Sequence, residues 1–217
     1  MELRDLVGVR RSTLRSALSA DAARARIAEL IDGPFNLMGS KPLIGTTSSQ
    51  GASFRRRLGY RNSFQTVMDV GVEAQGATTT LRARSYMHPY AMVFMAIWFI
   101  GAGVATAALL LASTAPGSPY SPLFALFPLV FAAFGVLMVF VGRWFARDDH
   151  DLMLEAVIRA TDATVVEAGG YRPRSAEELA ASQEGPLNAR LVLLFVLAVV
   201  VALGAAGGLF YVMGGPG

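Results

Sequence analysis

Hydrophobic residues in this chain are gathered in two long stretches without charge. No Asp, Glu, Lys or Arg occurs between Arg84 and Arg143, and none follows Arg190. A helix that crosses a bilayer needs about 20 mostly apolar residues, so the first stretch is long enough for two such helices and the second for one. The pattern therefore predicts three transmembrane helices, separated by segments of ordinary charge density.

Proline and glycine residues mark where the first two of these helices begin and end. The segment 114–122 holds three prolines and a glycine, which predicts a loop between a helix over 89–113 and a helix over 122–144. Ser121 suits the N-cap of the second helix. Pro128 lies inside that helix, where a proline removes a backbone donor, and is expected to kink it.

The third predicted helix, over 187–213, has small residues at a four-residue spacing. Such spacing lets two helix backbones approach closely. We expect this stripe to pack against another helix, either in the same chain or in a partner subunit. The stripe consists of Ala198, Ala202, Gly204, Ala206 and Gly208.

Before the first apolar stretch the pattern changes twice. Residues 2–18 have the spacing of a basic amphipathic helix, and a second helix is expected from an N-cap at Ser19 to about Ile31. From residue 42 onward hydrophobic and polar residues alternate, and turn residues interrupt the alternation, which predicts strands. The expected strands are 42–48, 52–60, 64–74 and 77–86.

These elements predict an α+β membrane protein, with a small cytoplasmic antiparallel β-meander, N-terminal helices and three transmembrane helices. After the second apolar helix the chain is expected to continue as one amphipathic helix over 143–168, with the acidic cluster 148–151 on its solvent-exposed surface. The expected segments are 1–33 (N-terminal amphipathic helices), 34–86 (antiparallel sheet), 87–144 (transmembrane hairpin), 145–186 (cytoplasmic helical segment) and 187–217 (third transmembrane helix and external tail).

The basic residues predict an orientation. All 19 Lys and Arg residues lie in 1–84 and 143–190. Cytoplasmic segments of membrane proteins carry an excess of Lys and Arg, so both segments are expected in the cytoplasm. The expected location is the bacterial inner membrane, with the N-terminus cytoplasmic and the C-terminus periplasmic or external.

One face of the predicted sheet is basic. The fourth predicted strand leads directly into the first membrane helix, so its arginines are expected near lipid headgroups. Each Lys or Arg near an anionic leaflet contributes about 1 kcal/mol of attraction. No nucleic-acid-binding motif accompanies the charge, so membrane lipids are the expected partner and nucleic acid is not. The expected headgroup residues are Arg55, Arg57, Arg61, Arg82 and Arg84.

Composition argues against several kinds of chemistry. The chain has no Cys, which excludes disulfides, zinc–thiolate sites, iron–sulfur clusters and cysteine nucleophiles. Apart from Arg143 and Arg190 near their ends, the predicted membrane helices hold no acidic or basic residue that would mark a proton relay or ion pathway. We therefore expect no enzyme, no catalytic residue, no cofactor and no metal.

An interfacial enzyme site is the alternative to this expectation. Arg61 and Asn62, beside Tyr60, would hold a phosphate, and His88 would act as a base. The structural explanation of the same residues is a turn at Asn62 and an anchor at the membrane edge at His88.

Several residues between Pro42 and Trp98 form a recognisable pattern. They are Phe54, Tyr60-Arg61-Asn62-Ser63-Phe64, Gly76-Ala77-Thr78, His88-Pro89 and the stretch Phe94 to Trp98. With this pattern the chain resembles a family of bacterial membrane proteins of unassigned function, as far as about Val166. The resemblance implies a small cytoplasmic antiparallel sheet followed by a transmembrane helical hairpin, and it implies no activity.

Two functional hypotheses follow. The leading one is a non-enzymatic accessory or assembly subunit of a larger bacterial inner-membrane complex, in contact with other transmembrane subunits. The second is a lipid- or stress-responsive membrane module whose basic sheet faces the leaflet.

Overall fold

The computed structural model describes residues 9–36, 39–58 and 64–173. The described residues belong to two compact units. The sheet unit contains the residues up to Val93 and those from Val139 onward, and the hairpin unit contains Phe94–Met138. Each unit is considered by itself.

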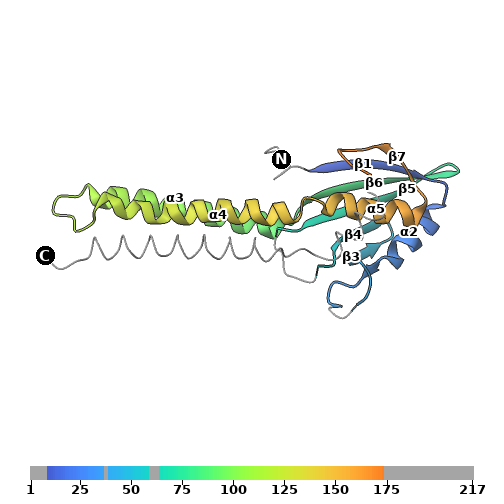
Figure 1. Ribbon diagram of the computed structural model, residues 1–217, viewed down its shortest axis with the longest axis horizontal. Coiled ribbons are helices and arrows are strands. Elements are labelled where there is room, and N and C mark those ends of the chain that lie inside the picture. The colour runs from blue at the N-terminus through green and yellow to red at the C-terminus, as the bar shows by residue number, and fades with distance from the viewer. Residues whose placement is uncertain (1–8, 37–38, 59–63, 174–217) are drawn as a thin grey trace. The chain divides into compact units, whose positions relative to one another are not determined.

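The elements of the described chain are shown in Figure 1. The strands are β1 (Arg10–Ser16), β2 (Ile31–Asp32), β3 (Leu43–Ser48), β4 (Gly51–Arg56), β5 (Thr66–Gln75), β6 (Thr78–Met87) and β7 (Thr164–Glu167). The helices are α2 (Ala20–Glu29), α3 (Pro89–Ser113), the 3-10 helix η1 (Pro122–Ala125), α4 (Leu126–Phe145) and α5 (Asp149–Thr161).

The strands form one seven-stranded sheet in the order β2-β3-β4-β5-β6-β1-β7. Neighbouring strands from β3 to β6 pair antiparallel, as do β6 with β1 and β1 with β7. The short β2 pairs parallel with β3. The sheet is therefore mixed, and it is larger than the predicted four-stranded antiparallel meander.

The first strand corrects the prediction of a helix over 2–18, because residues 10–16 form β1. Every second residue of this strand faces inward, as the period of a strand requires. The inward residues Ser12, Leu14 and Ser16 are all buried. Since two of the three are serines, a search for apolar residues alone finds no alternation here.

The two buried serines are hydrogen-bonded to backbone. Ser12 Oγ donates to the Ala168 carbonyl oxygen at 2.9 Å, and Ser16 Oγ donates to the Thr161 carbonyl oxygen at 2.5 Å. A buried hydroxyl that makes a hydrogen bond avoids the cost of an unpaired polar group. These bonds tie β1 to the end of α5 and to the residue after β7.

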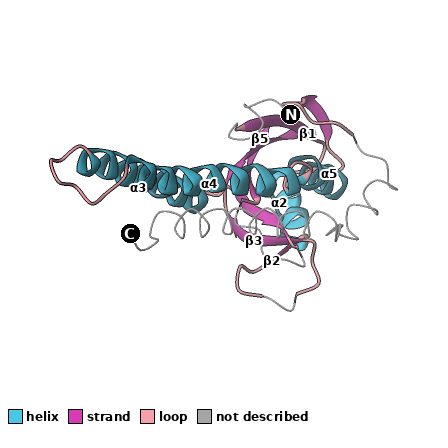
Figure 2. Cartoon of the chain, turned by 60° about the vertical axis from the view of Figure 1, so that its left-hand side comes forward, coloured by secondary structure: helices cyan, strands magenta, loops and turns pink. Residues whose placement is uncertain are grey.

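Helices α2 and α5 lie against the same face of the sheet (Figure 2). Side chains from both helices and from the inner face of the sheet form one hydrophobic core, and their burial is the main favourable term in folding. The opposite face carries exposed charged residues. The largest fully buried core side chains are Phe54, Leu14, Ile27, Leu43, Met68, Leu81, Met153 and Leu154.

The start of α2 is the one predicted from the sequence. Ser19 is the N-cap, and its Oγ accepts a hydrogen bond from the Ala22 N–H at 3.3 Å. Such a bond satisfies one of the free donors in the first turn of a helix. The helix ends at Glu29, earlier than expected, because the chain enters β2 at Ile31.

Two helical stretches are long and apolar enough to cross a membrane. The first is α3, which has the bounds predicted for the first membrane helix, and the second begins at Pro122. Ser121 accepts a hydrogen bond from the Leu123 N–H at 3.3 Å, so it is a cap as predicted, although it caps η1. Pro128 is the third residue of α4 and so lies in its first turn, where a missing N–H costs little.

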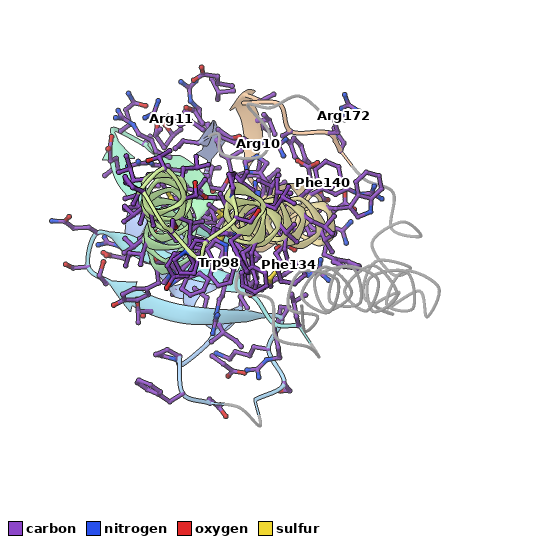
Figure 3. All side chains as sticks on the ribbon, turned by 90° about the vertical axis from the view of Figure 1, so that its left-hand side faces the viewer. Arg10, Arg11, Trp98, Phe134, Phe140 and Arg172 are labelled. Carbon is purple, nitrogen blue, oxygen red and sulfur yellow. The ribbon has the colours of Figure 1, made fainter. Side chains whose placement is uncertain are left out.

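Within the hairpin unit, Gly135 marks a close approach to Trp98. A Cβ atom at position 135 would lie 2.8 Å from Trp98 Nε1. The same indole N–H donates to the Phe131 carbonyl oxygen at 3.1 Å. Figure 3 labels Trp98 and the half-buried Phe134 in this unit. Gly135 therefore leaves the space that the indole ring occupies.

The predicted single helix over 143–168 is wrong. The chain turns at 146–148 and starts α5 at Asp149. The helix ends at Thr161, and its C-cap is Asp162, whose φ of 47° lies in the left-handed region that Asp tolerates better than most residues. The residues after it form β7 at the edge of the sheet.

The predicted third membrane helix, over 187–213, lies outside the described residues. So does its small-residue stripe of Ala198, Ala202, Gly204, Ala206 and Gly208. Both stay predictions.

Candidate functional site

The first turn of α5 is buried and bonded to several strands. Asp149, His150 and Asp151 are 1%, 2% and 5% exposed. Successive residues of a helix point in different directions because a turn takes 3.6 residues, so the three side chains reach different parts of the sheet. The prediction that this acidic cluster lies on a solvent-exposed surface is therefore wrong.

Asp149 reaches β4 and β5. Its Oδ1 lies 3.3 Å from Arg56 Nη1, and its Oδ2 accepts a hydrogen bond from the Thr66 N–H at 3.4 Å. Arg143, near the end of α4, donates to Thr66 Oγ1 at 3.1 Å. The carboxylate also sits at a helix N-terminus, where the helix dipole favours negative charge. These bonds connect the end of α4, the start of α5 and two strands.

His150 and Asp151 reach two other strands of the sheet, β6 and β1. His150 Nδ1 is 2.5 Å from Ser85 Oγ of β6, and within the described chain its Nε2 has no hydrogen-bond partner. Asp151 Oδ1 is 3.0 Å from Arg10 Nη2 of β1. Arg10 also donates to the Gly170 carbonyl oxygen at 2.5 Å. The first turn of α5 is thus fixed to four strands.

Burial shifts both titratable groups at the start of this turn. It raises the pKa of Asp149 to about 6, although the nearby Arg56 guanidinium, the Thr66 N–H and Arg143 oppose the rise. Burial, and then the positive charge of Arg10, lowers the pKa of His150 to about 3. At neutral pH Asp149 is therefore mostly ionised, which suits its ion pair, and the imidazole is neutral.

Within the sheet unit, the end of α4 packs tightly against Phe64. A Cβ atom on Gly142 would lie 2.3 Å from Phe64 Cδ2, so only glycine fits this approach. The next residue is the buried Arg143, which bonds to Thr66. We call the buried residues Arg143, Asp149, His150 and Asp151, together with their contacts to the strands, the anchor of α5. This anchor includes the last turn of α4.

The face of the sheet opposite α2 and α5 has a different character. It carries five exposed arginines on the three strands β1, β4 and β6, and we call this surface the open basic face. Arg11 and Arg10 of β1 are labelled in Figure 3; Arg10 bonds to α5, whereas Arg11 is exposed. The open basic face consists of Arg11, Arg15, Arg55, Arg82 and Arg84.

One row of residues crosses the open basic face. Arg11 of β1 is directly opposite Arg84 of β6, and Arg84 is directly opposite Asp69 of β5. Asp69 accepts a hydrogen bond from Ser53 Oγ at 2.6 Å.

Tyr86 lies beside this row. The Arg84 guanidinium lies 5.5 Å from the Tyr86 ring centroid, a cation–π distance. Burial and then the neighbouring Asp69 raise the pKa of the Tyr86 hydroxyl.

A hollow of about 420 Å³ opens on β1, β6 and β7. Arg15 and Arg82 line it together with Thr13 and Thr80. Arg82 also forms an exposed ion pair with Glu73 at 3.1 Å. Guanidinium and hydroxyl donors in one hollow are the groups that bind phosphate oxygens.

Of the predicted headgroup residues, the structure brings three together. Arg55, Arg82 and Arg84 are exposed on the open basic face. Arg57 instead forms an ion pair with Asp32 at 2.6 Å, and Arg61 lies outside the described residues. Contact with lipid stays a prediction for all of them.

Sequence reasoning missed Arg11 and Arg15. Both lie on β1, which the sequence pattern predicts as a helix and therefore does not place in the sheet. The available signal is the alternation of Arg11, Thr13 and Arg15 with Ser12, Leu14 and Ser16, which becomes visible once small polar residues count as inward-facing.

The alternative enzyme site is described only at His88. Its Nδ1 accepts a hydrogen bond from the Tyr90 N–H at 3.3 Å, and the two rings stack at 5.1 Å. His88 therefore caps the start of α3, while Tyr60, Arg61 and Asn62 lie outside the described residues. Within the described chain, no group of three or more His, Asp or Glu residues is placed to hold a metal ion.

No protein-family model matches the chain, and no curated protein matches it. The resemblance to a family of bacterial membrane proteins therefore stays a prediction.

Proposed function

We propose that this chain is a non-enzymatic integral protein of the bacterial inner membrane and acts as an accessory or assembly subunit of a larger membrane complex. Two helical stretches, α3 and the one from Pro122, are long and apolar enough for spans, which supports membrane insertion. The Lys and Arg residues flank these stretches, which supports a cytoplasmic sheet unit. Contact with other transmembrane subunits is assigned to the third predicted helix.

The anchor of α5 is the observation that carries this proposal. Between Arg143 and Asp151 the chain leaves an apolar helix and bonds to four strands through buried polar side chains. These bonds hold the last turn of α4 on the sheet. A subunit that presents a docking surface beside a membrane needs such a fixed attachment, because a loose tether would add an ordering cost to each docking event.

Purification from native membranes in a gentle detergent tests the proposal. We expect the wild-type chain to migrate in a particle larger than a monomer, together with other membrane proteins. Migration as a lone monomer contradicts it. Mass spectrometry of the excised particle identifies the partner chains.

Two adjacent arginines provide matched variants for this experiment. Arg56→Gln removes the partner of the buried Asp149, whereas Arg55→Gln changes an exposed residue on the other face of the same strand. We expect R56Q to reduce the amount of large particle and R55Q to leave it unchanged. Circular dichroism confirms that both variants keep their secondary structure, and an equal loss of particle in both variants contradicts the role of the anchor.

A further inference from the structure

We propose that the open basic face binds the anionic phospholipid headgroups of the membrane that α3 enters. This inference rests on the proposed placement of the chain in a membrane. It adds a partner for a surface that the proposed accessory function does not use.

Within the part of the chain that the structure describes, acidic residues do not balance the positive charge of this face. Five arginines share it with three acidic residues, Asp69, Glu73 and Glu167, and each acid already has a neighbour. Asp69 accepts from Ser53, Glu73 pairs with Arg82, and Glu167 accepts from Thr13. Among the described residues, the guanidinium groups of Arg11, Arg15 and Arg55 have no ion-pair partner.

The pairing of Arg11 with Arg84 points to an external anion. Like charges directly opposite each other on neighbouring strands are unfavourable. Folding brings these two residues together through the register of β1 and β6. A phosphate bound between them removes the repulsion, because the planar guanidinium group donates two parallel hydrogen bonds to phosphate oxygens.

The chain keeps this face close to the start of α3. Arg84 precedes Pro89, the first residue of α3, by five positions. At about 3.3 Å per residue, an extended chain of that length reaches at most about 17 Å. Tyr86 lies between them, and aromatic residues of this type are enriched at membrane interfaces. Because the segment between Arg84 and Pro89 is this short, lipid headgroups are the anions nearest to Arg84.

A fluorescent label on the full-length chain tests this inference. The chain has no Cys, so a single introduced thiol is the only labelling site. Gly71→Cys is suitable because Gly71 lies opposite Arg82 on the open basic face, and only one atom, the Arg82 carbonyl oxygen at 3.9 Å, would lie near its Cβ. The labelled chain is placed in nanodiscs that contain a constant fraction of lipid with a nitroxide quencher on the headgroup.

Quenching reports how close the face is to the headgroups. We expect stronger quenching in discs that contain phosphatidylglycerol than in discs of phosphatidylcholine alone, and we expect high salt to remove the increase. R11Q/R84Q should lose most of the increase, because it removes the two facing arginines of the open basic face. R26Q/R159Q removes two exposed arginines from α2 and α5, on the other side of the sheet, and should keep it.

The outcomes separate this inference from the proposed function. Equal quenching in both kinds of disc, or an equal loss in the two double variants, overturns lipid binding by this face. If R11Q/R84Q leaves quenching unchanged but removes a protein from the native particle, the face binds an acidic protein and the lipid proposal is wrong. A chain that does not enter the discs at all overturns the membrane placement itself.

Discussion

Arg11 of β1 lies directly opposite Arg84 of β6 on the exposed face of the sheet. Because the two charges repel each other, Arg11→Gln should stabilise the isolated protein by about 0.2–1 kcal/mol when no anionic lipid is present. Denaturant unfolding in neutral detergent, followed by circular dichroism, measures the change.

Arg26→Gln is the control for this prediction. Arg26 is exposed on α2 and lies 3.9 Å from Glu29, so its loss should bring no gain in stability. A lower free energy of unfolding for R11Q than for the wild type would show that Arg11 stabilises the sheet by a contact within the protein.

The burial of His150 predicts that the free energy of unfolding falls in acid. The pKa of His150 is lowered to about 3 in the fold, against an ordinary value of 6.5, so the unfolded chain binds a proton that the folded chain does not. The stability that the neutral imidazole contributes is present above pH 6.5 and is lost as the pH falls toward 3. His150→Gln should therefore unfold with a weaker pH dependence over this window.

The other histidine is a matched control, since the chain has only two. His88→Gln should keep the acid sensitivity of the wild type. Equal slopes of unfolding free energy against pH in H150Q and the wild type would rule out a buried neutral His150.

The burial of Asp149 predicts a pH dependence of the unfolding free energy with the opposite sign to that from His150. The pKa of Asp149 rises from 3.8 to about 6 in the fold, so the contribution of its protonated form is present below pH 3.8 and is lost as the pH rises through 6. The free energy of unfolding of Asp149→Asn, relative to that of the wild type, should therefore be higher at pH 7 than at pH 4. The same unfolding measurement at the two pH values checks this.

Asp21→Asn is the comparison for Asp149. The Asp21 side chain is 94% exposed, and surface substitutions of this kind change stability by less than about 0.5 kcal/mol. If the free energy of unfolding of D149N relative to the wild type is higher at pH 4 than at pH 7, the burial of this carboxylate is contradicted.

Gly135 predicts a steric effect in the hairpin unit. Gly135→Val places a side chain where Trp98 Nε1 would be 2.8 Å from the new Cβ, so we expect a loss of about 1–3 kcal/mol from overpacking. Gly101→Val is the control, because nothing lies within 4 Å of its Cβ position. The thermal unfolding temperature and the tryptophan emission, to which Trp98 contributes, should change in G135V and not in G101V.

The sequence predicts the apolar helices and the middle strands better than the rest of the fold. α3 follows directly from an uninterrupted apolar run that begins at a proline. The strands β3 to β6 follow from alternation and turn residues. These signals are local, so a single sequence contains them.

The candidate site depends on contacts that are distant in sequence. Nothing near Asp149 predicts that Arg56 will neutralise it, so a run of acidic residues resembles a solvated helix surface. The apolar pattern does not predict β1, because its inward residues include serines whose hydroxyls bond to backbone at Thr161 and Ala168. Arg11 joins the open basic face only through the pairing of β1 with β6.

Labelling of single cysteines in intact cells tests the central claim, that the chain crosses the membrane with its sheet unit in the cytoplasm. Ala115→Cys lies in the exposed loop between α3 and η1, and Gly71→Cys lies on the sheet. With a membrane-impermeant maleimide that passes the outer membrane, we predict labelling of A115C in intact cells and of G71C only after lysis. Labelling of G71C in intact cells, or protection of A115C until lysis, would contradict the account.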